Sequence, residues 1–286
     1  MSIWQAIVLG IVQGLTEFLP VSSSAHLLIV PWLFGWESPG LAFDAALHLG
    51  TLAAVLVYFW RDLTAMAVAF PRAIRHPAAM LRSRDPADVM PRLSLLIALG
   101  TLPGLVAGVL AAETIDAVYH PEGVAPDRII LAVAVALIAL ALLLWWAERA
   151  ARHVHGVESL TVRDALIVGL AQAAALLPGV SRSGATITAG LFRGLTRADA
   201  ARFSFLLGAP IVAAAGAKGL LDTLTSGLDA SQLGVFGAGL LASALAGFAA
   251  IWGLLRYLQR ASTAVFIVYR IVVGVGLIAL VMSRGS

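Results

Sequence analysis

Long runs without a charged side chain are the feature that most restricts how this chain can fold. Residues 129–147 form an uncharged run of 19 residues, and residues 230–255 form one of 26. A helix needs about 20 apolar residues to cross the hydrocarbon core of a bilayer. Only 12% of the residues are charged, whereas soluble domains carry about 25%. The sequence therefore predicts an integral membrane protein, and because alternating apolar patterns are missing, its spans should be helices.

Six apolar segments are long enough to cross a membrane, and two further apolar regions are interrupted near their middles. The uninterrupted segments are residues 41–60, 93–112, 129–147, 203–221, 233–255 and 264–282. The interrupted regions are residues 3–35 and 165–192. Each interruption places a proline and a cluster of hydroxyl side chains at a depth where polar groups are costly, which is typical of a functional site.

The charges of the loops predict how the chain is oriented. Loops 61–92, 148–164 and 193–202 are rich in arginine and should be cytoplasmic, whereas loop 113–128 holds four acidic residues and one arginine. Loops 148–164 and 193–202 flank the interrupted region 165–192. This region must then enter and leave the membrane on the same side, as a re-entrant hairpin. The same reasoning makes region 3–35 a re-entrant hairpin from the opposite side. Since these loops explain the basic net charge, no nucleic-acid partner is expected.

The two interrupted regions are similar to each other. Residues 13–26 read QGLTEFLPVSSSAH, and residues 172–186 read QAAALLPGVSRSGAT. The order of glutamine, proline and a Ser-x-Ser group is the same in both. A Leu-Gly pair follows in each half, with Gly50 27 positions after Ser23. In the second half the corresponding glycine is Gly208, which lies 26 positions after Arg182.

Each half then consists of one hairpin and three crossings. Because three is odd, the second half has inverted topology, an arrangement that is common among transporters. We therefore predict an all-α polytopic protein with six transmembrane helices and two re-entrant helix pairs in inverted repeats. It should form a single membrane domain over residues 1–286, with repeats at about 1–147 and 160–286.

Arg182 stands between two serines, just before Gly184. A guanidinium group matches phosphate oxygens, and a helix that begins here would add free backbone N–H groups. Pro178 and Gly179 should end the preceding half-helix, and the next should begin near Ser183. The alternative is an arginine that reaches water or pairs with an acid, but the flanking serines favour anion binding.

Glu17 lies one helical turn after Gln13, so both side chains should face the same side. Glu17 fits the roles of general base, metal ligand or partner that orients His26. The alternative is a structural ion pair with Arg182. His26 fits a proton carrier or a nucleophile that attacks phosphorus, or more simply a group that hydrogen-bonds between helices.

The hydroxyl groups of both motifs fit either helix caps or phosphate ligands. Asp44 and His48 should share a helix face. They either surround the site as a second layer or form a structural pair. Arg270 and Lys218 should extend to water at the membrane surface. The chain has no cysteine, which excludes thiolate chemistry.

Both motifs resemble the signatures of the bacitracin-resistance-type undecaprenyl-diphosphate phosphatases, and the likeness extends over nearly the whole chain, including residues 266–270. It implies a bacterial inner-membrane enzyme that removes the terminal phosphate of the C55 lipid diphosphate at the periplasmic side. Recycling of the lipid carrier for peptidoglycan synthesis and bacitracin resistance would follow. It also implies six crossings and two re-entrant pairs. The alternative, from architecture alone, is a transporter or flippase of lipid phosphate.

The resemblance implies catalytic roles for Glu17, Ser23, His26 and Arg182, with Ser23, His26 or water as the attacking group. It implies phosphate-binding roles for several further polar residues: Gln13, Ser22, Ser24, Ser181, Ser183 and Thr186. Divalent cations stimulate this family, so Mg or Ca is an expected cofactor with Glu17 as candidate ligand. Many members carry Glu at the position of Gln13. Because this chain lacks that carboxylate, any scheme in which two acids share one metal is weakened. The expected partners are undecaprenyl diphosphate, membrane lipid and a second copy of the chain in a homodimer.

Overall fold

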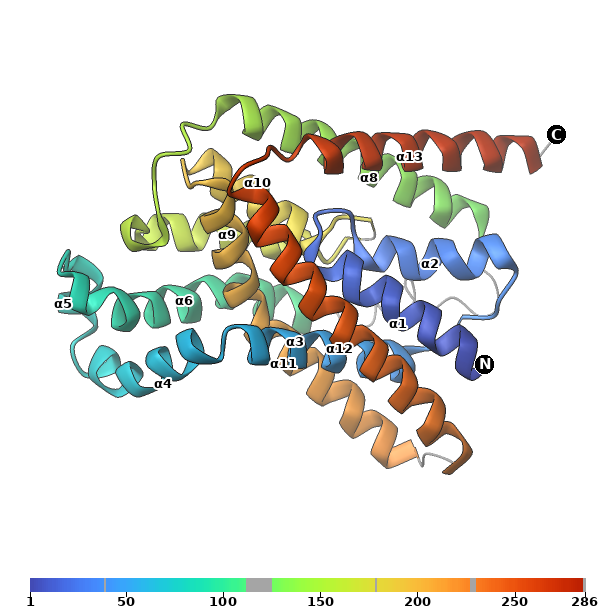
Figure 1. Ribbon diagram of the computed structural model, residues 1–286, viewed down its shortest axis with the longest axis horizontal. Coiled ribbons are helices and arrows are strands. Elements are labelled where there is room, and N and C mark those ends of the chain that lie inside the picture. The colour runs from blue at the N-terminus through green and yellow to red at the C-terminus, as the bar shows by residue number, and fades with distance from the viewer. Residues whose placement is uncertain (39, 112–124, 178, 227–229, 285–286) are drawn as a thin grey trace.

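The computed structural model describes residues 1–38, 40–111, 125–177, 179–226 and 230–284, and within these ranges the chain is helical with short connections (Figure 1). The helices of the first half are α1 (Ile3–Phe18), α2 (Ser23–Phe34), α3 (Leu41–Tyr58), α4 (Trp60–Arg75), α5 (Pro77–Arg82), η1 (Pro86–Asp88), α6 (Val89–Leu110) and α8 (Asp127–Ala150). Those of the second half are η2 (Val157–Ser159), α9 (Val162–Ala174), α10 (Arg182–Phe192), α11 (Arg197–Ser226), α12 (Ala230–Leu258) and α13 (Ala264–Arg284).

Five helices of the described ranges are long and apolar enough to cross a membrane, or six if α3 and α4 count as one span. The five are Pro86–Ala111, Asp127–Ala150, Arg197–Gly219, Leu233–Leu258 and Ala264–Arg284. Between α3 and α4 the helix axis turns by 80°. Helix α4 is amphipathic and carries Arg72 and Arg75 in its last turn. The prediction of an all-helical, multi-pass membrane protein is confirmed.

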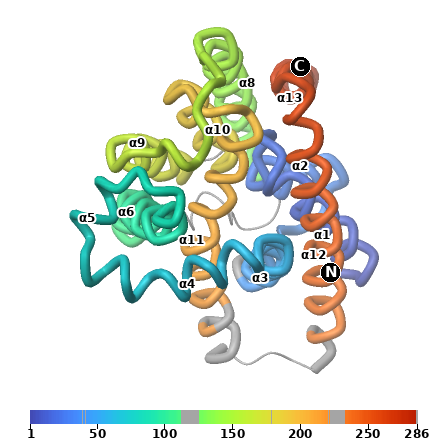
Figure 2. The backbone as a smooth tube through the Cα atoms, turned by 60° about the vertical axis from the view of Figure 1, so that its left-hand side comes forward, coloured from blue at the N-terminus to red at the C-terminus, as the bar shows by residue number. Residues whose placement is uncertain are grey.

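Two helix pairs reverse direction near the middle of the molecule. Helix α1 runs inward from the end that carries both chain termini, and α2 returns to that end (Figure 1). Helix α9 runs inward from the opposite end, and α10 returns there (Figure 1). Helix α11 lies in the centre of the bundle, with α3 on one side and α6 on the other (Figure 2). The two turns thus approach each other inside the protein.

Local chemistry explains where both pairs turn. Ser22 caps α2 by accepting a hydrogen bond from the Ala25 amide, and it holds a φ of 80°, which is strained for a residue with a side chain. In the second turn Gly179 has the same φ, and a Cβ there would lie 2.9 Å from that of Ala136. Ser181 caps α10 through the Gly184 amide at 3.0 Å.

The start of α10 at Arg182 confirms the predicted helix start near Ser183. Helix α9 ends at Ala174, earlier than the predicted stop at Pro178 and Gly179. Pro178 itself lies outside the described residues.

Helix α1 lies against α12 with little room between the backbones. A Cβ on Gly14 would be 2.5 Å from the carbonyl oxygen of Ser243, and a Cβ on Gly10 would be 2.4 Å from that of Gly239. Small residues permit this close approach, as they do where membrane helices cross. The contact fixes the rotation of α1, so that Glu17 points toward the centre of the protein.

Candidate active site

The two turns are held together by direct hydrogen bonds. Ser183 Oγ donates to the carbonyl oxygen of Leu19 at 3.1 Å. The guanidinium of Arg270 donates to the carbonyl oxygens of Pro20 at 3.0 Å and Gly179 at 3.4 Å. It also donates from Nε to the carbonyl of Leu137 on α8 at 3.0 Å. One buried cation thus satisfies backbone carbonyls of both turns, which have no helical partner.

This position of Arg270 corrects the sequence analysis, which predicted that its side chain extends to water. Arg270 is fully buried. The position of Arg270 in the sequence predicts a membrane surface. In the structure its guanidinium instead donates hydrogen bonds to carbonyl oxygens of two turns that are remote in the sequence. Lys218 is exposed.

We expect Arg270→Met to lower the stability of the protein by about 3 kcal/mol or more, because it leaves the carbonyl oxygens of Pro20 and Gly179 without a donor in a buried site. Such a loss corresponds to a midpoint of thermal unfolding lower by about 6 to 12 °C. Unfolding of the purified protein in detergent measures it. Arg260→Met, in the exposed loop between α12 and α13, is the matched control. Equal midpoints for the two variants would contradict this role of Arg270.

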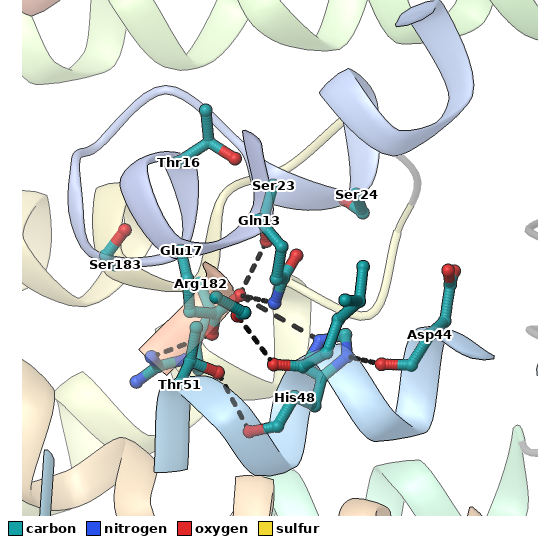
Figure 3. Close-up of polar contacts among 12 residues, drawn as sticks. Gln13, Thr16, Glu17, Ser23, Ser24, Asp44, His48, Thr51, Arg182 and Ser183 are labelled. Atoms are coloured by element: carbon teal, nitrogen blue, oxygen red, sulfur yellow. Dashed lines mark hydrogen bonds and ion pairs between the residues drawn. The ribbon is translucent and has the colours of Figure 1, made fainter. Parts of the chain in front are cut away.

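Glu17 is the centre of the polar cluster in Figure 3, and its side chain is 6% exposed. Its Oε1 accepts a hydrogen bond from Arg182 Nη2 at 3.0 Å. Its Oε2 accepts one from Ser23 Oγ at 2.6 Å and one from Gln13 Nε2 at 3.1 Å. His48 Nε2 lies 3.9 Å from the same oxygen. Residues from α1, α2, α3 and α10 therefore meet at one carboxylate.

Arg182 is the first residue of α10 and reaches Glu17 across the two turns. Its Nη1 also donates to the carbonyl oxygen of Ser204 on α11 at 3.2 Å. A Cβ on Gly208 would lie 1.5 Å from that nitrogen, so only glycine leaves space for the guanidinium. This contact explains why a Leu-Gly pair follows the second motif.

Two polar atoms of the cluster are buried without a hydrogen bond to any residue that the structure describes. They are Nε of Arg182 and Oε1 of Gln13. A buried donor and a buried acceptor of this kind normally find a partner in water or ligand. They identify this cluster as a place where a polar ligand can bind.

A cavity of about 300 Å³ opens beside this cluster. Its polar lining consists of Glu17, Ser23, Ser24, Ser38, Asp44, His48, Ser181 and Arg182. Its apolar lining consists of Leu27, Leu28, Ala45, Ala175, Leu176, Val180, Ile211, Val212 and Ala215. An anionic group can therefore approach Arg182 and the start of α10 while an apolar chain contacts the apolar part of the lining.

Several predicted phosphate ligands face away from this cavity. Ser22 is fully buried and caps α2. Ser183 is buried between Leu19 and Ser181. Thr186 is buried and bonds to the carbonyl of Arg182 and to Ser204 Oγ. These hydroxyl groups hold the turns and the first turn of α10 in place.

His26 is also separate from Glu17. Its Nδ1 lies 2.6 Å from the carbonyl oxygen of Ser22, and its Nε2 lies 2.7 Å from Tyr269 Oη. The two rings stack with centroids 5.7 Å apart. Sequence reasoning considered Glu17 as the residue that orients His26, whereas in the structure the backbone of the first turn and Tyr269 on α13 orient it.

His48 is one of two cavity residues, with Asp44, that sequence reasoning left undecided. Its spacing from Asp44 suggested a pair of side chains, but His48 Nδ1 lies 2.7 Å from the backbone carbonyl of Asp44. Its other nitrogen faces Glu17. The four-residue spacing of Asp44 and His48 correctly predicts a shared helix face. It does not predict that this face lies toward Glu17 on α1.

Comparison with known proteins adds an independent result. A family model described as "Bacitracin resistance protein BacA" matches residues 6–276. A protein of Thermomicrobium roseum named undecaprenyl-diphosphatase is 51% identical over 98% of this chain and 99% of its own length. A protein with the same name from Synechococcus elongatus is 44% identical over 100% of this chain and 95% of its own length. Another, from Pelotomaculum thermopropionicum, is 42% identical over 99% of this chain and 98% of its own length.

Proposed function

Because this chain belongs to the family of bacitracin resistance protein BacA, we propose that it hydrolyses undecaprenyl diphosphate to undecaprenyl phosphate and inorganic phosphate. The reaction recycles the lipid carrier for peptidoglycan synthesis, and it confers resistance to bacitracin. The alternative interpretation as a transporter has no support among the relatives, which are named as diphosphatases. The substrate is a membrane lipid, and the protein has helices apolar enough to share its membrane.

One observation carries the proposal. The hydroxyl of Ser23 donates to Glu17 at 2.6 Å, and the other oxygen of Glu17 is 3.0 Å from Arg182. A nucleophile, a base and a phosphate ligand thus meet on the wall of one cavity. Polar side chains are costly inside a membrane protein, so their grouping here is typical of a functional site.

In the first step Ser23 Oγ attacks the terminal phosphorus. The Oγ–P bond forms, the bond from phosphorus to the bridging oxygen breaks, and undecaprenyl phosphate leaves with the electron pair. The proton of the hydroxyl passes to Oε2 of Glu17, to which it is already hydrogen-bonded. In the second step water attacks the same phosphorus and gives a proton to the ionised Glu17. The Oγ–P bond breaks, inorganic phosphate leaves, and Glu17 passes the proton to Ser23 Oγ.

Arg182 stabilises the charge that spreads over the equatorial oxygens of the phosphoryl group. Before substrate binds, it is held by Glu17 and by the carbonyl of Ser204. These contacts keep the guanidinium extended toward the cavity, so little reorganisation is needed when phosphate arrives. The dipole of α10, which begins at this residue, adds to the same effect.

The geometry supports Ser23 rather than His26 as the attacking residue. Both ring nitrogens of His26 are hydrogen-bonded within the protein, and its side chain does not contribute to the cavity wall. Its bond to the carbonyl of Ser22 fixes the turn that presents Ser23. We assign His26 the role of a positioning residue.

A divalent cation, expected from the resemblance, has no ready-made site here. Among the residues that the structure describes, no three His, Cys, Asp or Glu side chains are grouped so that they could hold a metal ion. Both oxygens of Glu17 are engaged by Arg182, Ser23 and Gln13. The described residues therefore offer no site made of protein groups alone for a Mg or Ca ion, and the cation stays a prediction from the resemblance.

The arrangement also supports the finer topology. We infer that α1–α2 and α9–α10 are re-entrant pairs from opposite membrane faces, because each pair opens toward a different end of the molecule (Figure 1). Gly10 and Gly169 hold equivalent places, each three residues before the glutamine of its motif. Each closely approaches a helix of the other half, at Gly239 and Gly100 respectively. This exchange of contacts supports inverted repeats.

With the arginine-rich loops in the cytoplasm of a bacterial cell, the enzyme lies in the inner membrane and its cavity opens to the periplasm. Association of two copies into a homodimer stays a prediction.

The activity is tested with the purified protein in detergent and undecaprenyl diphosphate. We expect equal amounts of inorganic phosphate and undecaprenyl phosphate to accumulate. Detergent micelles have no two sides, so product formation cannot arise from transport. Binding of the diphosphate without release of phosphate would refute the proposal.

A further inference from the structure

The proposed reaction leaves a proton on a carboxyl group that is almost fully buried. Glu17 receives the proton of Ser23 on Oε2, and its side chain is 6% exposed. Arg182 and the amide nitrogen of Gln13 are hydrogen-bond donors and cannot accept that proton. Before the carboxylate can act as a base for the attacking water, it must pass this proton on.

His48 is oriented to accept it. The carbonyl oxygen of Asp44, 2.7 Å from Nδ1, can only accept a hydrogen bond. In the neutral ring Nδ1 therefore carries the hydrogen and Nε2 holds the free electron pair. That nitrogen lies 3.9 Å from Oε2 of Glu17, which is too long for a direct hydrogen bond but short enough for one bridging water or a small rotation of the ring.

His48 is also the more exposed of these two cavity-lining groups. Its side chain is 32% exposed and lines the cavity wall, whereas that of Glu17 is 6% exposed. In Figure 3 it lies on α3, across from the turn that carries Ser23. A proton on this ring is therefore more accessible to cavity water than a proton on Glu17.

We propose that His48 is a proton relay that acts through Glu17, an inference that rests on the phosphatase activity proposed above. After Ser23 attacks, the proton moves from Oε2 of Glu17 to Nε2 of His48 and then to cavity water. Glu17 is thereby returned to its ionised form, and in the second step it takes a proton from the attacking water. The relay consumes no additional reactant, since each proton that enters it is released to water.

Charged groups face His48 from several elements. Glu17 faces it from α1, Arg182 from the start of α10, and Asp44 lies one turn earlier on α3. On α11 the cavity wall is apolar, and Lys218 follows one turn after Ala215. The part of α12 at residues 233–255, which packs on α3, has no charged side chain.

The test is the pH dependence of kcat for phosphate release from undecaprenyl diphosphate, with the full-length protein in detergent between about pH 5 and 9. In the wild type, kcat should fall on the acid side, in the range where histidine becomes protonated and can no longer accept a proton. His48→Gln should lower kcat by about 100-fold, with KM within about twofold, and should remove this acid limb. His76→Gln, at an exposed position, is the matched control and should retain the wild-type kcat and the acid limb.

Chemical rescue distinguishes a relay from a structural role. His48→Ala should regain activity when imidazole is added, because the cavity of about 300 Å³ admits a small base. Wild-type activity and an unchanged acid limb in His48→Gln would overturn the relay. So would a uniform loss at all pH values without rescue in His48→Ala. Failure of the wild-type protein to release phosphate would instead refute the proposed function.

Discussion

Arg182→Ala should lower the rate of phosphate release by about a thousandfold or more. The guanidinium is the only cationic side chain on the wall of the described cavity apart from the titratable His48, and no neighbouring group can replace its two parallel donors. Arginines that stabilise the transition state of phosphoryl transfer contribute about 10³ to 10⁵ to the rate. Initial rates of inorganic phosphate formation from undecaprenyl diphosphate provide the measurement, with Arg260→Ala as an exposed control.

The loss should occur in a folded protein. The two turns are joined by Arg270 and Ser183, which are independent of Arg182. Removal of the cation leaves Glu17 with Ser23 and Gln13 as hydrogen-bond donors, and Glu17→Gln in the same background removes the unpaired charge. Arg182→Lys keeps the charge but loses the fork, so it should recover substrate binding better than kcat. Turnover of Arg182→Ala within tenfold of the wild type would show that this side chain does not hold the reacting phosphoryl group.

Ser23→Ala should be about as severe, since removal of a nucleophile commonly costs a thousandfold or more. The wild type, quenched during turnover, should carry one phosphoryl group on Ser23, detectable by the intact mass of the protein and by peptide mapping. Ser23→Ala should carry none. Ser24→Ala is the informative neighbour, because Ser24 also lines the cavity but has no hydrogen bond to Glu17, and its loss should reduce the rate by less than about tenfold.

A different outcome would identify a different attacking group. If Ser23→Ala retains activity and no phosphoprotein forms, water attacks directly and Ser23 only orients Glu17. If the phosphoryl group is found on His26, the assignment made here is wrong, because the ring would have to leave both Ser22 and Tyr269 before it could react.

Much of the site follows from residues that are close together in the sequence. Proline and serine at the centre of an apolar region predict an interrupted helix, because they leave backbone groups unpaired and then cap the next helix. The two turns and the start of α10 at Arg182 follow from this chemistry. The prediction of a second, similar turn also brings Glu17 and Arg182 together, although they are 165 positions apart.

Other contacts could not be inferred in this way, because they depend on the rotation and crossing of helices that are remote in the sequence. Arg270 is buried because the carbonyls of two turns converge on it, and these turns belong to different halves of the chain. His26 contacts Tyr269, 243 positions away, rather than the nearby Glu17. A rotation of one residue turns a helical side chain by about 100°, so sequence spacing alone leaves its partner undefined.

The sequence by itself thus determined that the protein is a helical membrane protein with two polar interruptions, since hydrophobicity and helix capping act over a few residues. The tertiary structure decided which side chains share one carboxylate. Close packing of α1 on α12 and of α3 beside α11 sets the distances among Glu17, Ser23, Arg182 and His48. Such packing depends on the fit of whole helix surfaces, which no short stretch of sequence contains.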